Sequence, residues 1–382
     1  MTLASSVRVA VFLSLAACSR AETESDDVVR TDSAGVRIVT SGAVDRELKW
    51  TFEEIGPLLD TLGTPWIFNS VDSRSVVTDR AGRTYVLTDE PAVVQFGRNG
   101  RIERSIGRRG GAPGEMRAPA ALLVQGDSLA VHDRQRNVLV RWGPTLEPIA
   151  DLPLVGALEG ADAIAFRSGG AWIFRHVFDL AGSNITLIGD TLAPTALLTL
   201  TQPRPTILRG CGGLAIGLPP FFSPEFTWST YKGQLLVNVG PAYDLRLFEG
   251  PRLIASVRRQ LTPRAGELDD IRRAHPEGYR LQAGPVDCTF PLEQLVEGPG
   301  IAPLFPLVFG VALLSDGTIW VKRSAGTLTP PILDVFTSDG AYAGTLRGMQ
   351  LPLALLPNGE LLVPRDDVGN GGIQIVRMRV VR

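Results

Sequence analysis

Histidine is scarce in this chain. Among 382 residues it occurs three times, as His132, His176 and His275. Catalytic zinc sites commonly take three protein ligands, with histidine as a usual donor. Because His275 falls on a segment expected to be an inserted helix, the three imidazoles are not expected to meet. We therefore predict no three-histidine zinc centre and assign no residue as a metal ligand.

Cysteine is equally rare, with only Cys18, Cys211 and Cys288. No two of them have the Cys-x-x-Cys spacing of redox and zinc motifs. No serine stands in a Gly-x-Ser-x-Gly turn, so nucleophilic hydrolysis has no support. The glycine-rich stretch at 107–114 lacks the Lys-Ser/Thr ending of a phosphate-binding loop. We predict no catalytic residue, and whether the protein is an enzyme stays open.

The chain also lacks a large surplus of charged residues of either sign. The 38 lysines and arginines nearly balance the 40 aspartates and glutamates, for a formal net charge of −2. Nucleic-acid-binding domains normally carry a basic surplus, so no nucleic-acid partner is expected. The 44% hydrophobic content is that of a globular chain that can bury a sizeable core.

The chain has one apolar run near its start, and it is short. Val9–Ala17 follows Arg8 and is shorter than the ~20 residues of a membrane-spanning helix, but it fits the apolar core of a secretory signal. The run ends in Leu15-Ala16-Ala17-Cys18, which resembles the bacterial lipobox, whose cysteine is lipidated. An ordinary signal peptide with an incidental cysteine is the alternative.

The lipobox resemblance implies an order of segments. Residues 1–17 are a signal peptide, Cys18 carries the lipid, and the polar, acidic residues 18–35 are a flexible tether. The membrane is thus a partner through the N-terminal lipid, and the rest of the chain is extracytoplasmic. Ser19, rather than aspartate, implies the outer membrane if the cell has one.

Glycine, with 41 residues, is abundant, and six glycines mark a repeated phrase. Each is followed by apolar residues, as in Gly359-Glu360-Leu361-Leu362-Val363. These glycines stand at 82, 126, 170, 233, 317 and 359, at intervals of 44, 44, 63, 84 and 42. Propeller blades repeat every ~40–45 residues. The repeat predicts an all-β, six-bladed β-propeller of four-stranded antiparallel blades over residues 36–382.

The ends of the repeat and its long intervals need extra elements. The last repeat, 353–381, shows three strands, and we expect a strand from Val36 to supply the fourth and close the propeller. The long intervals should hold a Pro- and Gly-rich loop at 201–224 and one inserted helix that starts near Thr262 and stops at His275. A degenerate seventh blade is the alternative for the longer interval.

Cys211 and Cys288 fall in these two insertions. Outside the cytoplasm they can form a disulfide, which would join the two loops. Two unrelated buried thiols are the alternative.

The junction between the first two repeats shows a family pattern. Residues 106–119 contain clustered glycines, Glu115 and Pro119, and they resemble the linkers of NHL-repeat propellers. Asp133 and the segment 137–140 fit the same pattern, whereas the third and fourth repeats depart from it. The whole chain resembles bacterial six-bladed propeller lipoproteins of unassigned function. This resemblance implies the fold and location, but the NHL family includes both binding scaffolds and lyases.

Candidate ligand residues lie on the same junction. Arg108, Arg109 and Arg117 could form an anion-binding rim, because such loops commonly line one propeller face. Solvated surface arginines are the alternative.

Two further groups have a functional and a structural interpretation. Turn aspartates leave a calcium site open, although aspartate is common in turns anyway; they are Asp79, Asp89, Asp133, Asp316 and Asp339. Aromatic residues after Pro220 either cover the channel mouth or pack in a core; they are Phe221, Phe222, Phe226, Trp228 and Tyr231.

These features predict a non-catalytic binding scaffold at the cell envelope, whose partner is an envelope protein or a small ligand. Rigid blades that present variable loops suit that role. The alternative is a metal-dependent hydrolase or lyase with its site in the central channel. No cofactor is predicted.

The lipid anchor can be tested by Cys18→Ser. Without the thiol that accepts the lipid, the chain should stay unlipidated and uncleaved at that site. The mass of the intact protein and its share in the membrane fraction measure this. A membrane fraction equal to that of the wild type would remove the lipoprotein assignment.

Overall fold

The computed structural model describes most of the chain after residue 27. The described residues are 28–88, 90–125, 128–154, 163–167, 170–179, 182–188, 196–210, 213–223, 225–283, 286–323, 330–367, 369 and 371–381. Cys18 and Cys211 lie outside them.

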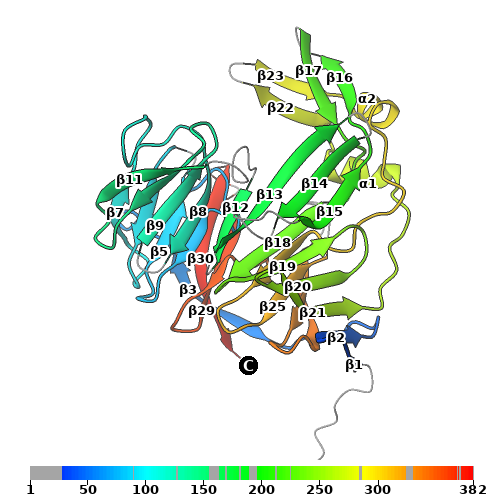
Figure 1. Ribbon diagram of the computed structural model, residues 1–382, viewed down its shortest axis with the longest axis horizontal. Helices are drawn as coiled ribbons and strands as arrows, with labels where there is room; N and C mark the ends of the chain where they lie inside the picture. The colour runs from blue at the N-terminus through cyan, green and yellow to red at the C-terminus, as the bar shows by residue number, and fades with distance from the viewer. Residues whose placement is uncertain are drawn as a thin grey trace, which may run out of the picture.

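Five sheets have four antiparallel strands each (Figure 1). Sheet I comprises β4 (Val76–Thr78), β5 (Thr84–Leu87), β6 (Val93–Phe96) and β7 (Ile102–Ile106). Sheet II comprises β8 (Pro119–Gln125), β9 (Ser128–Asp133), β10 (Val138–Trp142) and β11 (Pro148–Pro153). Sheet III comprises β12 (Ala163–Arg167), β13 (Gly170–Asp179), β14 (Gly182–Ile188) and β15 (Ala196–Gln202). Sheet V comprises β24 (Gly310–Leu313), β25 (Ile319–Lys322), β26 (Ile332–Phe336) and β27 (Tyr342–Arg347). Sheet VI comprises β28 (Ala354–Leu355), β29 (Glu360–Asp367), β30 (Gly372–Val381) and the N-terminal β3 (Thr51–Pro57).

Sheet IV has six strands instead of four. Its consecutive strands are β18 (Phe226–Tyr231), β19 (Gln234–Val239), β20 (Asp244–Glu249) and β21 (Arg252–Arg259), and β2 (Val36–Ser41) and β1 (Val28–Ser33) extend them. The prediction of six four-stranded blades is therefore corrected: the structure has five. The reason is that the N-terminal hairpin adds to an edge that the repeat pattern leaves open.

Apolar clusters fill the spaces between neighbouring sheets. Tyr85 of sheet I packs with Leu122 and Val140 of sheet II, and other buried residues of sheet I pack against sheet VI. Comparable clusters join sheet IV to sheet V and sheet V to sheet VI. The chain is thus an all-β propeller of antiparallel blades, as the spacing of its glycines predicts.

The predicted closing strand lies in a different sheet. β2, which starts at Val36, pairs in parallel with β21 of sheet IV, and the fourth strand of sheet VI is β3. A register shift between Glu54 and Gly56 interrupts the apolar alternation of β3, so its sequence signal is weak. β1 begins at Val28, so residues 28–33 of the expected tether form a strand.

The N-terminal segment 28–57, here called the belt, runs along the outer edges of three sheets. β2 lies on β21, Glu47 forms a bridge with Thr345 of β27, and β3 lies on β30. Gly344 lets the belt approach β27, because a Cβ there would lie 2.6 Å from Leu48 Cγ. The belt therefore links sheets IV, V and VI.

A buried guanidinium holds the belt in place. Arg259 Nη1 lies 3.0 Å from both Asp334 Oδ2 and Asp45 Oδ1, and its Nη2 donates to the carbonyl oxygens of Gly42 and Val44 at 3.1 and 2.9 Å. Its Cζ lies 3.9 Å from the centre of the Tyr342 ring. The side chains of Arg259 and Asp334 are both 0% exposed. Buried charges persist only when paired, so this contact is strongly constrained.

Asp334 is satisfied from several sides. Tyr243 Oη donates to its Oδ2 at 3.0 Å, Thr345 Oγ1 donates to its Oδ1 at 2.8 Å, and Arg323 Nε lies 3.1 Å from Oδ2. Burial raises the pKa of Tyr243 well above its ordinary value, and the charge of Asp334 adds to the effect. Tyr243 therefore stays a neutral hydrogen-bond donor.

The two insertions form one small subdomain, here called the cap (Figure 1). It contains β16 (Thr206–Gly210), β17 (Leu214–Leu218), α1 (Leu268–Ala274), β22 (Tyr279–Ala283), β23 (Val286–Phe290) and α2 (Leu292–Glu297). Leu208, Ile271, Phe290 and Leu295 are buried in its own core. Two helices replace the single predicted one, and α1 begins after Glu267 rather than near Thr262. Asp270 explains that start, since it accepts the N–H of Glu267 at 2.9 Å.

The Arg259 pair can be tested with a matched control on the same strand. Arg259→Met leaves Asp334 buried without one of its partners and should lower the free energy of unfolding by about 3–5 kcal/mol. Arg252→Met removes an exposed pair with Glu249 and should cost less than about 1 kcal/mol. Urea unfolding followed by tryptophan fluorescence measures both. Equal losses in the two variants would show that the belt does not depend on Arg259.

Candidate functional site

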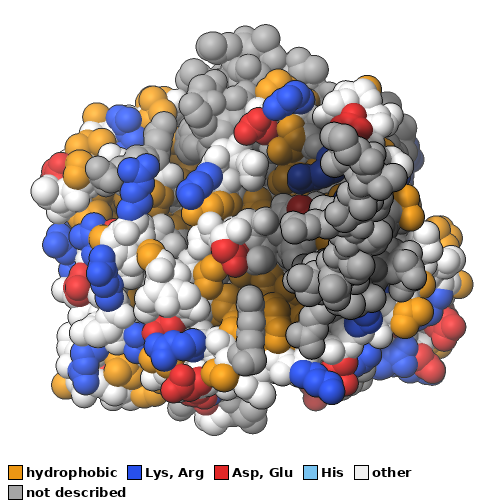
Figure 2. Space-filling model, turned by 90° about the horizontal axis from the view of Figure 1, so that it is seen from below, with side chains coloured by type: hydrophobic (Ala, Val, Ile, Leu, Met, Phe, Trp, Pro, Cys, Tyr) orange, Lys and Arg blue, Asp and Glu red, His pale blue; other side chains and the backbone are white. Residues whose placement is uncertain are grey.

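The propeller has one elaborated face. In each antiparallel sheet the first strand starts at the same end at which the fourth strand stops, so the connections between sheets gather at that end. The cap arises from two such connections, β15 to β18 and β21 to β24, and the loop 106–119 is a third. Seen from the side away from the cap, charged side chains of both signs surround a central hollow with hydrophobic side chains (Figure 2).

Glu115 organises the loop 106–119. Its Oε2 accepts the N–H groups of Gly111 and Ala112, each at 2.9 Å, and its Oε1 accepts Arg108 Nε at 2.7 Å. The N–H of Ala112 and then the Arg108 guanidinium hold the pKa of Glu115 below its usual range. The loop is thus a defined structure with an anionic centre.

The three predicted rim arginines share this loop and are exposed. Arg108 is engaged with Glu115, although its side chain remains 80% exposed. The backbone N–H of Arg117 donates to Asp133 Oδ2 at 2.6 Å, and its guanidinium donates no hydrogen bond to a residue in the described ranges. The loop brings the three residues to one face without building a closed site around them.

The described calcium candidates have structural partners. Asp133 is buried and accepts backbone N–H groups of Arg117, Ala118 and Arg136. Asp79 pairs with Arg83 at 2.6 Å, Asp316 accepts Thr318, and Asp339 lies 3.1 Å from Arg30. Asp89 lies outside the described residues. Within the part of the chain that the structure describes, no group of three or more His, Cys, Asp or Glu could hold a metal ion.

His132, His275 and the predicted aromatic residues do not form one site; the side chain of His176 lies outside the described residues. His132 is buried on β9, and His275 packs in the cap, 5.3 Å from the Phe221 ring and 5.5 Å from the Tyr279 ring between centres. The predicted aromatic set is divided among three apolar clusters: Phe221 and Phe222 in the cap, Phe226 and Trp228 beside β19, and Tyr231 between sheets IV and V. Their arrangement is that of core packing.

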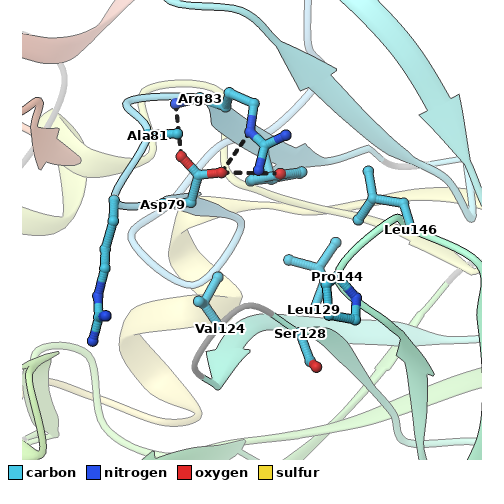
Figure 3. A pocket seen from close by; sticks show the side chains of 10 residues that line it. Asp79, Ala81, Arg83, Val124, Ser128, Leu129, Pro144 and Leu146 are labelled. Carbon is cyan, nitrogen blue, oxygen red and sulfur yellow. Dashed lines mark hydrogen bonds and ion pairs between the residues drawn. The ribbon is translucent and has the colours of Figure 1, made fainter.

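A cavity of about 250 Å³ lies between sheets I and II, away from the cap (Figure 3). One wall comes from the turn between β4 and β5, and the other from Val124 at the end of β8, from Ser128 and Leu129 at the start of β9, and from Pro144 and Leu146 after β10. Figure 3 shows Asp79 and Arg83 pointing toward each other on one side, with Val124, Leu129, Pro144 and Leu146 across from them. The cavity therefore has a polar wall and an apolar wall.

The polar wall is held by hydrogen bonds. Asp79 accepts Arg83 Nε at 2.6 Å, the Arg83 backbone N–H at 2.9 Å and Tyr85 Oη at 3.2 Å. Burial, followed by the charge of Asp79, raises the pKa of Tyr85 to about 12. Tyr85 is thus a neutral donor at physiological pH. Sequence reasoning named Asp79 only as a turn aspartate, because the apolar wall that faces it comes from another sheet and leaves no local pattern.

Comparison with known proteins supports the fold and shows no family. The chain matches no family profile and no curated protein. It is similar to a Bacteroides fragilis protein described as exported, with 10% identity and a TM-score of 0.52 over 90% of this chain and 100% of that one. It is also similar to a member of the DUF4221 family from Bacteroides vulgatus, with 9% identity and a TM-score of 0.50 over 89% and 100%. At these identities the likeness shows the fold alone.

Asp270 makes the cap sensitive to acid. Hydrogen bonds from Arg264 lower the pKa of Asp270 to about 2, burial opposes them, and Arg273 adds to the lowering. Since the folded pKa is below the ordinary value of 3.8, the stabilisation is present above about pH 4 and is lost as the pH falls through about 2.

Asp270→Asn tests this linkage. The variant should lose about 2 kcal/mol of unfolding free energy near pH 6, and its difference from the wild type should shrink toward pH 2. The control is Asp269→Asn, because Asp269 forms an exposed pair with Arg272, and it should show little dependence on pH. Urea unfolding at several pH values gives the differences; a penalty for Asp270→Asn that stays constant with pH would contradict the assignment.

Proposed function

We propose that this protein is a lipid-anchored, non-catalytic binding scaffold of the cell envelope, which recognises its partner through the cap face. The single observation that carries the proposal is the gathering of both insertions on one face, where they pack around a core of their own. Loops on a rigid framework are where proteins commonly place recognition. The exposed arginines of the loop 106–119 belong to the same face and would favour an anionic partner.

In this proposal the blades are of the NHL type. The strands β18–β21 of sheet IV form an antiparallel meander like those of the other five sheets, and β1 and β2 are additions to its outer edge. β3 joins β30 as the outer strand of sheet VI. That pairing of an N-terminal strand with the last C-terminal strands would close the ring.

The proposed location is outside the cytoplasm, with the lipid on Cys18 in the outer membrane where the cell has one. The sequence Leu15-Ala16-Ala17-Cys18 supports the anchor. None of the helices in the described ranges is long and apolar enough to cross a membrane. The similar Bacteroides fragilis protein is described as exported, which agrees with such a location.

We also propose that Cys211 pairs with Cys288. Cys288 is buried and disulfide-bonded. A Cβ on Gly210, the residue before Cys211, would lie 3.5 Å from Cys288 Sγ, so the chain passes beside that sulfur. Such a bond would join the two insertions and stabilise the cap by about 2–5 kcal/mol.

Site-specific photo-crosslinking in living cells tests the cap face. A photoreactive residue replaces Ile207, which is 57% exposed on β16, or Arg109 on the loop 106–119. Both should give the same discrete crosslinked product. The matched control replaces Glu249, which is exposed at the end of β20, next to the turn to β21 at the other end of the sheets. A product from Glu249 alone, or none from either cap-face position, would refute the scaffold proposal.

Metal analysis of the purified, dialysed full chain separates the scaffold from the alternative hydrolase or lyase. The scaffold is expected to carry no stoichiometric metal. About one calcium, zinc or manganese per chain would instead favour the enzyme and justify a screen of lactone and ester substrates.

A further inference from the structure

We propose that the cavity between sheets I and II is a binding site for a small, largely apolar monocarboxylate, whose carboxylate is held by Arg83. This site lies at the opposite end of the sheets from the cap, and it does not depend on the scaffold function. Three features of the cavity carry the inference: the state of Arg83, the charge of the lining and the apolar wall.

Arg83 is fixed in place but incompletely used. Its Nε–H donates to Asp79 at 2.6 Å, whereas its two terminal nitrogens donate no hydrogen bond to any residue that the structure describes. Its side chain is 39% exposed and lines the cavity. A guanidinium held in one orientation with free terminal N–H groups matches the two oxygens of a carboxylate. Because Asp79 already orders the Arg83 side chain, ligand binding costs less side-chain conformational entropy.

The charge of the lining favours a ligand with one negative charge. Among the described lining residues, Asp79 carries a negative charge and Arg80 and Arg83 carry positive charges. Among these described residues the positive charges exceed the negative by one, although the charge of Glu103 also acts on Arg83, so a ligand with a single negative charge suits the site. A phosphate dianion would exceed that surplus and would face Asp79.

The opposite wall would accept the apolar part of the ligand. Val124, Leu129, Pro144 and Leu146 line it, and Ser128 adds a hydroxyl. Figure 3 shows these side chains across the cavity from Arg83. The volume of about 250 Å³ is below the range of about 300–1,000 Å³ for drug-sized ligands. A single ring or a short acyl chain with one carboxylate therefore fits both the size and the polarity of the cavity.

Saturation-transfer NMR on the purified full chain, with benzoate and benzamide as probes, tests this site. The two probes have the same ring and similar size but differ in charge. Benzoate at millimolar concentration should receive saturation from the protein, and benzamide should receive little. Arg83→Gln should weaken benzoate binding at least about tenfold, since the charged bidentate contact is lost. Arg101→Gln, on the neighbouring turn of the same sheet and outside the cavity lining, should leave binding unchanged.

A second variant guards against a folding effect of Arg83→Gln. Ser128→Phe should fill the cavity and block benzoate while Asp79 and Arg83 remain, and the melting temperature of each variant shows whether it is folded. Loss of benzoate binding in folded Ser128→Phe supports the site even if Arg83→Gln unfolds. The proposal is overturned if benzoate does not bind the wild type, or if benzamide binds as well as benzoate. It is also overturned if folded Arg83→Gln or folded Ser128→Phe binds benzoate as well as the wild type does.

Discussion

The ion pair between Arg259 and Asp334 is the contact that joins the N-terminal belt to sheets IV and V. Two charges with no solvent exposure are stable only while every partner stays in place. The belt supplies Asp45 and the carbonyl oxygens of Gly42 and Val44. Sheet IV supplies Arg259 itself, and sheet V supplies Asp334 and the ring of Tyr342. The pair therefore couples the position of the N-terminal segment to the packing of two sheets.

The belt has a consequence for the rest of the molecule. The belt pairs with β21, bridges to β27 and supplies β3 to sheet VI, so one continuous chain segment contacts the outer edges of three consecutive sheets. Edge strands that would otherwise expose unpaired backbone groups are partly covered. A framework held in this way can carry a cap with its own core at one end of the sheets and a cavity between two sheets at the other end.

The sequence predicts those features whose signal is local. In sheets I, IV, V and VI a glycine recurs in the turn between the first two strands because a positive φ is needed there, at Gly82, Gly233, Gly317 and Gly359. The prediction of a propeller and of insertions in the two long intervals follows from this spacing. The prediction that the strand from Val36 completes the last sheet was wrong, since this strand pairs with β21. The prediction of a single inserted helix missed α2. A short apolar strand fits the edge of more than one sheet, and a six-residue helix after Pro291 has too few turns to show a period.

By itself the sequence determined the β-propeller architecture, through turn glycines and apolar triplets that act within a few residues. Only the tertiary structure decided which edge each N-terminal strand joins, how two insertions share one core, and that Asp79 and Arg83 face an apolar wall from the next sheet. These outcomes depend on contacts between residues far apart in the chain, such as Arg259 with Asp45 and Asp334. The burial of these side chains and the pairing of their charges decide the outcomes, and a local sequence pattern predicts neither.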